Sequence, residues 1–158
     1  MKLNLEINNT TRSSIKKDFF AKVIRRTLAE YNYDFLKRRI VSLSIALVAP
    51  LEIKKLNRIY RRKDSVTDIL SFSEYRSAQE LKKAVDKNIF LGELVMCYTE
   101  IGNYSKKTGR GIKEELARVV SHGLLHLLGL RHGKKMFSIQ NSIIKKDKNN
   151  EQRKSDKR

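Results

Sequence analysis

The segment SHGLLHLLGLRH, residues 121–132, contains all three histidines of the chain, His122, His126 and His132. Four positions separate the first two, about one helical turn, so both imidazoles can project from one helix face about 6 Å apart. Gly129 can end that helix, because a left-handed C-terminal turn costs glycine little. The chain can then reverse and bring His132 over the same face.

Three neutral imidazoles that converge in this way are typical of an open tetrahedral zinc site. A structural site is normally closed by a fourth protein ligand, whereas a catalytic site keeps one position for water. The single cysteine, Cys97, excludes an internal disulfide, lies outside this motif and is expected to pack in a strand. The pattern therefore predicts one zinc ion held by His122, His126 and His132; the alternative is an accidental spacing of ordinary histidines.

The spacing also matches the long zincin signature H-E-x-x-H-x-x-G-x-x-H, with one departure. Gly123 stands where a zinc protease has its general-base glutamate. Without that carboxylate, peptide hydrolysis by this route loses its proton acceptor. The segment therefore favours a metal-dependent hydrolase, and a zinc peptidase remains an alternative that fits the histidine spacing alone.

The charge of the chain indicates a polyanionic partner. The sequence holds 35 Lys and Arg against 17 Asp and Glu, a formal net charge of +18. Residues 134–158 contribute +6 and residues 1–133 contribute +12, so the excess is not confined to the C-terminal end. We expect affinity for nucleic acid that falls as salt rises, although a role in solubility would give the same count.

The length and the hydrophobic pattern predict one soluble domain. A chain of 158 residues is long enough for a real core, and no stretch approaches the ~20 apolar residues of a membrane span. The start, MKLNLEINNTTRSS, lacks a signal-peptide hydrophobic region, so we expect a cytoplasmic protein without membrane partners. Residues 1–146 are expected to form the domain, and residues 147–158 a basic, disordered tail.

Residue periodicity predicts the order of the elements. Strands are expected at residues 2–8, 41–49, 68–73 and 89–98, the last with a possible bulge at Gly92. Helices are expected from Ser13 or Ser14 to about 32, from Pro50 to 62, from Thr99 to near 109, at 112–128 and at 136–146. Strands mixed with helices imply a layered α+β domain with about four strands.

A second polar segment precedes the third expected strand. LNRIYRRKDSVTDILSFS, residues 56–73, is rich in charged and hydroxyl side chains for a segment that leads into a core strand. Arg61 and Arg62 follow a helix end, where cations suit the helix dipole. Near a metal ion, the guanidinium of Arg61 could bind a phosphate in bidentate fashion, whereas Arg62 and Lys63 fit better as solvated residues.

These segments resemble the YbeY-type endoribonucleases, a family of bacterial rRNA maturation factors. The family's histidine motif is H-G-x-L-H-L-x-G-y-D-H, which HGLLHLLGLRH at 122–132 follows. Its upstream motif L-N-x-x-Y-R-x-K-D-x-P-T-D-V-L-S-F-P is similar to residues 56–73. FLGELVM at 90–96 resembles the family's L-G-D-I-v-I strand, and residues 136–144 resemble its closing M-x3-E-x2-I-L helix. The resemblance covers about residues 45–145.

The resemblance implies that His122, His126 and His132 bind zinc and that Arg61 is a functional arginine that contacts RNA or its phosphate. It implies a small, mostly parallel mixed sheet with helices around a metal-binding cleft. The implied activity is zinc-dependent endonucleolytic cleavage of single-stranded RNA, in 16S rRNA 3′-end maturation and ribosome quality control. The implied partners are rRNA, the ribosomal subunit and assembly proteins. The alternative is a non-catalytic rRNA- or ribosome-binding assembly factor with a structural zinc.

The chain departs from the family motifs at several positions. Arg131 replaces the usual acidic residue before the last histidine, so a carboxylate that could orient a ligand or a water is missing. Val66 and Ser73 replace prolines, so the loop is expected to be less rigid, and Gln140 replaces the closing glutamate, a change expected to matter little. No general base is evident: a hydroxide on the metal, the RNA's own 2′-OH and Glu93 stay open as candidates.

Overall fold

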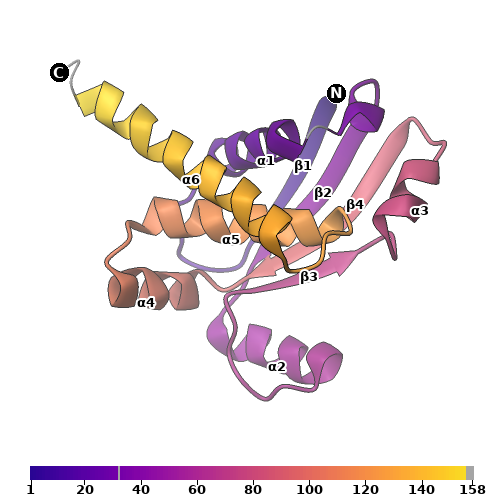
Figure 1. Cartoon of the computed structure of the whole chain (residues 1–158). Helices are drawn as coiled ribbons and strands as arrows, with labels where there is room; N and C mark the ends of the chain where they lie inside the picture. The colour runs from indigo at the N-terminus through magenta and orange to yellow at the C-terminus, as the bar shows by residue number, and fades with distance from the viewer. Residues whose placement is uncertain (32, 156–158) are drawn as a thin grey trace.

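A four-stranded sheet forms the centre of the computed structural model of this protein (Figure 1). The structure describes the backbone of residues 1–31 and 33–155 and the side chains of residues 1–31 and 33–145. The strands are β1 (Lys2–Asn9), β2 (Ile40–Leu47), β3 (Ile69–Ser73) and β4 (Asn88–Met96). Their spatial order is β1-β2-β4-β3, with β3 antiparallel to β4 and the other pairs parallel. The predicted α+β class and mostly parallel mixed sheet are confirmed.

Six α-helices lie in the described part of the chain, with a short 3-10 turn at Asp34–Leu36. They are α1 (Lys17–Tyr31), α2 (Pro50–Arg61), α3 (Ala78–Lys83), α4 (Tyr98–Thr108), α5 (Ile112–Leu127) and α6 (Lys134–Ser155). α1 and α5 share one hydrophobic core with the sheet, and α6 packs across α5 (Figure 1). α2 packs on the other face of the sheet, where Ile53 meets Leu70 and Val95.

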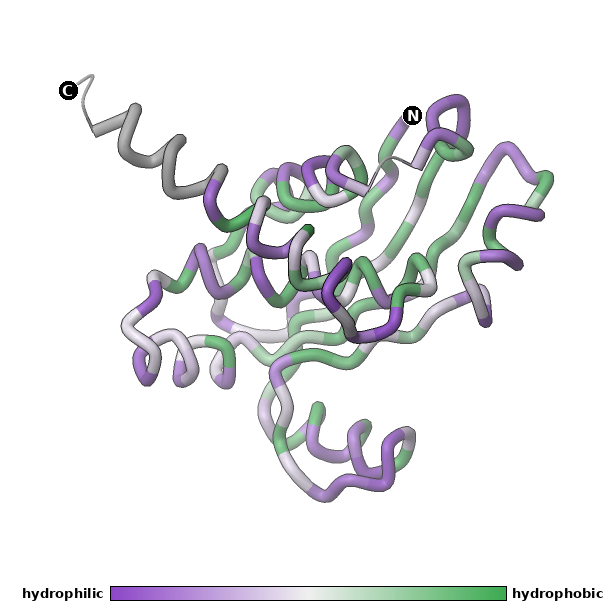
Figure 2. The backbone as a smooth tube through the Cα atoms, in the orientation of Figure 1, coloured by the Kyte–Doolittle hydropathy of each residue, from purple (hydrophilic) through white to green (hydrophobic). Residues whose placement is uncertain are grey.

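Side chains along β2 alternate between a face buried in the main core and a face that is only partly buried. Val41, Leu43 and Ile45 are buried in the core that α1 and α5 share. Ser42 and Ser44 lie between them, on the opposite face, and are only partly buried. Figure 2 shows the contrast along the chain: the central strands are largely hydrophobic, whereas α2 is largely hydrophilic.

The predicted bulge at Gly92 is present in β4. The register between β2 and β4 shifts after Ser42, which pairs with Phe90, while Ser44 pairs with Glu93. Gly92 has φ +127°, and a Cβ there would lie 2.0 Å from the carbonyl oxygen of Phe72, so the position requires glycine. The extra residue keeps the β4 residues on both sides of the bulge packed in the same core.

Two predicted helix starts are wrong. α1 begins at Lys17 rather than at the expected serine cap, because Ser13 is held in a turn by Asn9, whose Nδ2 donates to its carbonyl oxygen at 2.9 Å. α4 begins at Tyr98 with the buried Cys97 as its N-cap residue, so Thr99 lies inside the helix. Both differences are local and leave the order of elements as predicted.

Helix α3 was missed by the periodicity analysis, although its cap has a sequence signature. The Ser77 side chain accepts a hydrogen bond from the Glu80 backbone nitrogen at 3.1 Å. The Glu80 carboxylate in turn accepts from the backbone nitrogen of Arg76 at 2.7 Å. This S-x-x-E capping pattern can start a helix too short to show a hydrophobic period.

The last helix is longer than predicted. Its first half packs on α5 through Met136, Ile139 and Ile143, and its backbone stays helical to Ser155. Residues 147–155, for which the sequence predicts a disordered tail, continue the helix in the structure; Lys, Arg, Glu and Gln there are good helix formers. Residues 156–158 lie outside the described residues. Among the helices that the structure describes, none is long and apolar enough to cross a bilayer.

Candidate metal centre

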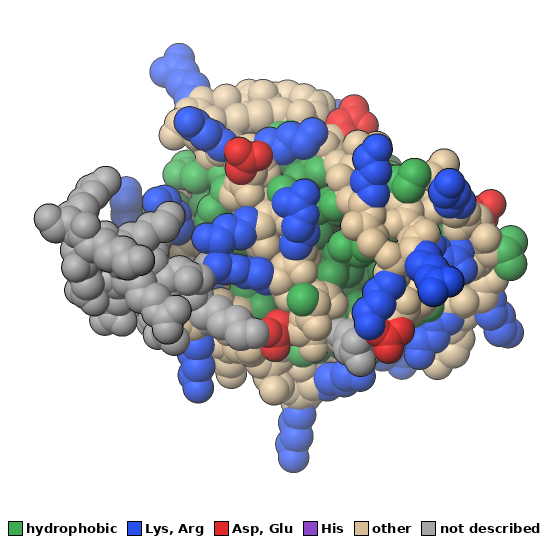
Figure 3. Space-filling model, turned by 90° about the horizontal axis from the view of Figure 1, so that it is seen from above, with side chains coloured by type: hydrophobic (Ala, Val, Ile, Leu, Met, Phe, Trp, Pro, Cys, Tyr) green, Lys and Arg blue, Asp and Glu red, His purple; other side chains and the backbone are tan. Residues whose placement is uncertain are grey.

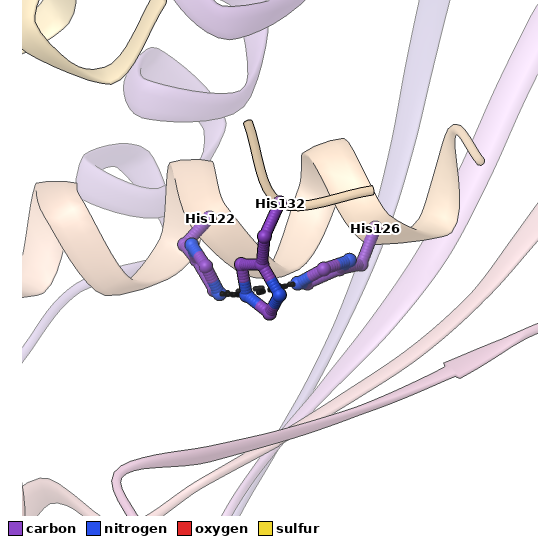
Figure 4. Close-up of side chains that lie close together, drawn as sticks. All are labelled: His122, His126 and His132. Atoms are coloured by element: carbon purple, nitrogen blue, oxygen red, sulfur yellow. Dashed lines mark hydrogen bonds between the residues drawn. The ribbon is translucent and has the colours of Figure 1, made fainter. Parts of the chain in front are cut away.

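The three histidines converge beside the C-terminal half of α5 (Figure 4). The Nε2 atoms of His122 and His126 are 3.1 Å apart, and the Nε2 atom of His132 lies 3.2 Å from each. Nitrogen ligands of a tetrahedral zinc ion, about 2.0–2.1 Å from the metal, lie about 3.3 Å from one another. The three nitrogens therefore have nearly the spacing that one ion requires.

The turn after α5 has the geometry that the glycine spacing predicts. The Gly129 backbone nitrogen donates to the His126 carbonyl at 2.9 Å, and the Leu130 nitrogen donates to the Leu125 carbonyl at 2.9 Å. Gly129 has φ +80°, so these bonds form the left-handed Schellman ending of a helix. The turn reverses the chain and returns His132 to the face that carries the other two histidines (Figure 4).

The same turn fixes the orientation of His126. Its Nδ1 lies 3.0 Å from the carbonyl oxygen of Leu130, which can only accept a hydrogen bond. Nδ1 therefore carries the proton and donates, and Nε2 keeps a lone pair directed at the other two imidazoles. This is the tautomer that a metal ligand needs.

Burial favours the neutral form of His122 and of His126. It is the main cause that lowers the pKa of His122 to about 4, and the two neighbouring histidines act in the same direction. Burial also lowers the pKa of His126, although its bond to Leu130 opposes the shift. Neutral rings bind metal ions without first releasing a proton, so the cluster is suited to a cation at neutral pH.

The histidines line a cleft of ≈ 550 Å³ between α5 and the segment that joins α2 to β3. Arg61, at the end of α2, lines the same cleft, and its charge contributes to the lowered pKa of His126. The structure thus brings together the two motifs that the sequence analysis singled out separately. Arg131 is exposed in the turn beside His132.

The loop that follows Arg61 is held without the family's prolines. Arg62 takes a left-handed conformation, φ 57°, and ends α2. Asn57 is buried, and its Nδ2 donates to the Ser65 carbonyl at 2.9 Å. Val66 packs against the cluster that contains Ile53. These contacts fix the loop from the α2 side.

Two further residues line the cleft: Arg118, which the sequence did not indicate, and Asp68, which the sequence indicated only as a residue that holds the loop. Arg118 lies on α5 one turn before His122, and its Nη2 is 3.5 Å from an Asp68 carboxylate oxygen. Fifty positions separate the two residues, so no local pattern predicts the pair. The only local signal is Glu115, an acidic residue on the core face of α5 that bonds Arg118.

Gln140 lies directly behind the metal centre. It is 4% exposed, and its Nε2 donates to the Arg118 carbonyl at 3.3 Å. Its side chain also lies close enough to His122 to favour the protonated form of the ring, against the effect of burial on the pKa of His122. A partner of the second ring nitrogen orients a metal ligand, and glutamine and glutamate can both accept a hydrogen bond from a ring, so the expectation that this replacement matters little stays a prediction.

Gly123, which stands where a zinc protease has its glutamate, lies where α5 packs closely on the sheet. A Cβ there would lie 2.5 Å from Ile69 Cδ1 and 2.9 Å from Leu94 Cδ2, so any larger side chain would require these two side chains to move. Glu93 does not supply the carboxylate either, since Leu94 packs toward α5 and its neighbour Glu93 projects from the other face, outside the cleft.

Fold and site together define an α+β protein with an open three-histidine centre beside an arginine. The family model described as "Endoribonuclease YbeY" matches residues 6–148. A protein of that name from Myxococcus xanthus is 37% identical over 109 residues, which cover 66% of this chain and 36% of the relative. One from Staphylococcus epidermidis is 35% identical over 112 residues, covering 65% and 70% of the two chains.

A third relative, the endoribonuclease YbeY of Thermodesulfovibrio yellowstonii, is 34% identical over 108 residues, covering 65% of this chain and 64% of its own. The solution structure of a Thermotoga maritima protein aligns with a TM-score of 0.55 at 22% identity, covering 89% of this chain and 87% of that protein. That likeness supports the fold. The chain belongs to the endoribonuclease YbeY family.

Proposed function

We propose that this protein is a zinc-dependent endoribonuclease that cleaves single-stranded RNA. The observation that carries the proposal is the convergence of three histidine nitrogens, 3.1–3.2 Å apart, in a cleft that Arg61 also lines. Membership of the endoribonuclease YbeY family supports RNA as the substrate.

The donor set suits one zinc ion. Three neutral imidazoles without a thiolate or a fourth protein ligand are typical of a zinc site that keeps a position open. When bound there, zinc would polarise a phosphoryl oxygen and make water a better nucleophile at neutral pH. His126 is oriented for this role by the Leu130 carbonyl, and Gln140 is the side chain beside His122 that could orient its ring.

Arg61 is the residue best placed to bind the scissile phosphate. In the described part of the chain it has no carboxylate within ion-pair distance, so its charge is available to a substrate. A guanidinium matches two phosphate oxygens and would stabilise the negative charge that develops there during cleavage. The only carboxylate that lines the described cleft is Asp68, which is paired with Arg118, so the RNA's 2′-OH and water at the metal stay the main candidates for proton transfer.

The overall charge supports a long polyanionic substrate. The net charge of +18 would draw RNA to the protein and make binding depend strongly on salt. Lys and Arg side chains are spread over the face seen in Figure 3, with few acidic ones and no histidine in view, so the basic surface extends beyond the cleft. A single strand suits a cleft that must reach one phosphate of a flexible backbone.

We further propose that the RNA is the 3′ end of 16S rRNA, and that the protein acts in the cytoplasm on rRNA or the ribosomal subunit during maturation and quality control. The test is cleavage of a single-stranded 16S 3′-precursor RNA by the purified protein, with zinc and after chelation. Chelator-sensitive cleavage that zinc restores is the expected result. RNA binding without cleavage in both conditions would instead favour a non-catalytic assembly factor with a structural zinc.

A further inference from the structure

Arg118 is held rigidly on α5 by a buried carboxylate. Its Nε donates to Glu115 Oε1 at 2.6 Å, and its Nη2 lies 2.5 Å from the same oxygen. Glu115 is fully buried, and the guanidinium also lies over the ring of Tyr104, 5.5 Å from its centre. Charge-assisted bonds of this kind fix the planar fork of an arginine in one orientation.

Arg118 then reaches across the cleft to Asp68. Its Nη2 lies 3.5 Å from Asp68 Oδ2, with both side chains partly shielded from solvent. Asp68 is itself fixed to the sheet: its Oδ1 accepts from the Ile69 nitrogen at 2.9 Å, and its carbonyl accepts from the Cys97 nitrogen at 2.9 Å. The ion pair therefore joins α5, which carries two of the histidines, to the start of β3.

Two contacts hold the loop between Arg61 and Asp68, one at its middle and one at its end. Asn57 holds its middle to α2 by the bond to Ser65, and the Asp68–Arg118 pair holds its end to α5. Arg61 lies at its start and lines the cleft with the histidines. The Asp68–Arg118 pair thus adds a direct link between this loop and α5, the helix that carries His122 and His126.

Charge balance argues against phosphate binding by Arg118 itself. Arg118 and Arg110 face the two carboxylates of Glu115 and Asp68, so the group has no net charge. Arg61, by contrast, has no acidic partner among the described residues. Arg118 is therefore better suited to link α5 to the start of β3 than to bind the substrate.

We propose that Asp68 and Arg118 are a positioning pair that holds the α2–β3 loop against α5 and so keeps Arg61 within reach of a phosphate at the metal centre. The proposal rests on the proposed nuclease function. Neither residue contacts the reacting atoms, and neither contributes a metal ligand. The pair acts through Arg61, and this dependence can be measured.

The main test is Asp68→Asn, alone and combined with Arg61→Ala. Asparagine keeps an oxygen for the Ile69 nitrogen, but it puts an NH2 donor in place of the charged acceptor oxygen that faces Arg118. We expect unchanged zinc content, an unchanged KM for a short single-stranded RNA, and a kcat lower by about 10- to 100-fold, because a small misplacement of a catalytic group has this effect. In the Arg61→Ala background, Asp68→Asn should cause no further loss. An equal loss in both backgrounds would overturn the proposal.

Arg110→Gln is the matched control. Arg110 contacts Glu115 at 3.5 Å but does not line the cleft, so this variant perturbs the same buried carboxylate without touching the ion pair. We expect near-normal kcat. A loss as large as that of Asp68→Asn would mean that general disturbance of the Glu115 network, and not the link across the cleft, controls activity.

Trypsin gives a readout that does not need nuclease activity, since Arg61, Arg62 and Lys63 are exposed in this loop. Asp68→Asn should speed tryptic cleavage after these residues several-fold, with cleavage elsewhere and the melting temperature unchanged. If the loop is released in this way but wild-type protein cleaves no RNA, the positioning pair stands and the nuclease function fails. Unchanged loop cleavage would overturn the positioning pair.

Discussion

A Cβ atom on Gly129 would lie 2.4 Å from the backbone nitrogen of Ala78, the first residue of α3. The close approach joins the turn after α5 to the start of a helix 51 positions earlier in the chain. Gly129 also has φ +80°, which L side chains rarely adopt. The positive φ angle and the close contact with Ala78 both require glycine at position 129. The direction in which the chain returns His132 to the site depends on this turn.

Gly129→Ala is therefore expected to destabilise the fold by about 1–3 kcal/mol, through backbone strain and the clash with α3. We also expect weaker zinc binding, because His132 would no longer meet the other two histidines. Gly133→Ala is the control: it follows His132 directly, but a Cβ there meets nothing within 4 Å. Thermal unfolding and zinc titration compare the two. Equal behaviour of both variants would show that the turn does not set the position of His132.

Gln140→Leu is expected to weaken zinc binding by about 10- to 100-fold, because His122 loses the partner that orients its ring. Gln140→Glu should keep most of the affinity, since a carboxylate can also accept from the ring. Asn141→Ala, at an exposed neighbouring position of α6, controls for general effects on the helix. The measurement is competition with a chromophoric chelator. Wild-type zinc affinity in Gln140→Leu would show that Gln140 does not orient His122 for metal binding.

Arg61→Ala should lower RNA cleavage by about 10²- to 10³-fold, as expected for loss of a group that stabilises transition-state charge. Its zinc content should stay normal. Arg62→Ala removes the same charge from the next exposed position, which does not line the cleft, and should have little effect on kcat. Similar losses in both variants would indicate that the loop contributes general positive charge and that Arg61 has no specific role.

The stability of the metal-free protein should depend on pH through His122. Its pKa in the folded protein is about 4, below the ordinary 6.5, so the unfolded chain binds the proton more readily. By linkage, this contribution to stability is complete above about pH 6.5 and is lost as the pH falls toward 4. Thermal unfolding of metal-free protein between pH 7 and pH 4 tests this. His122→Gln should flatten the dependence, and parallel curves for the two proteins would contradict the assignment.

Local patterns were sufficient to predict much of the fold. The histidine spacing with Gly129 predicted the end of α5 and its return, and the run of β-forming residues at 41–49 predicted the central strand β2. Gly92 marked a bulge because only glycine tolerates that backbone. Each of these features depends on residues a few positions apart in the chain, so a single sequence is enough to predict it.

Contacts between distant residues could not be predicted in the same way. Asp68 and Arg118 meet only because β3 and α5 pack side by side, and Gln140 reaches His122 only because α6 crosses α5. Each of these residues is an ordinary polar residue in its own segment. Their positions follow from tertiary packing, whereas the spacing of the three histidines already predicted that their side chains would meet.

The most direct test of the account measures zinc content and RNA cleavage together in the wild-type protein and in His126→Ala. His126 is the ligand candidate whose tautomer is fixed by the Leu130 carbonyl, and its Nε2 lies within 3.2 Å of both other histidines. We predict about one zinc per wild-type chain, and in His126→Ala the loss of zinc and of single-strand cleavage with the fold retained. Cleavage that survives in a zinc-free His126→Ala protein would contradict the metal mechanism.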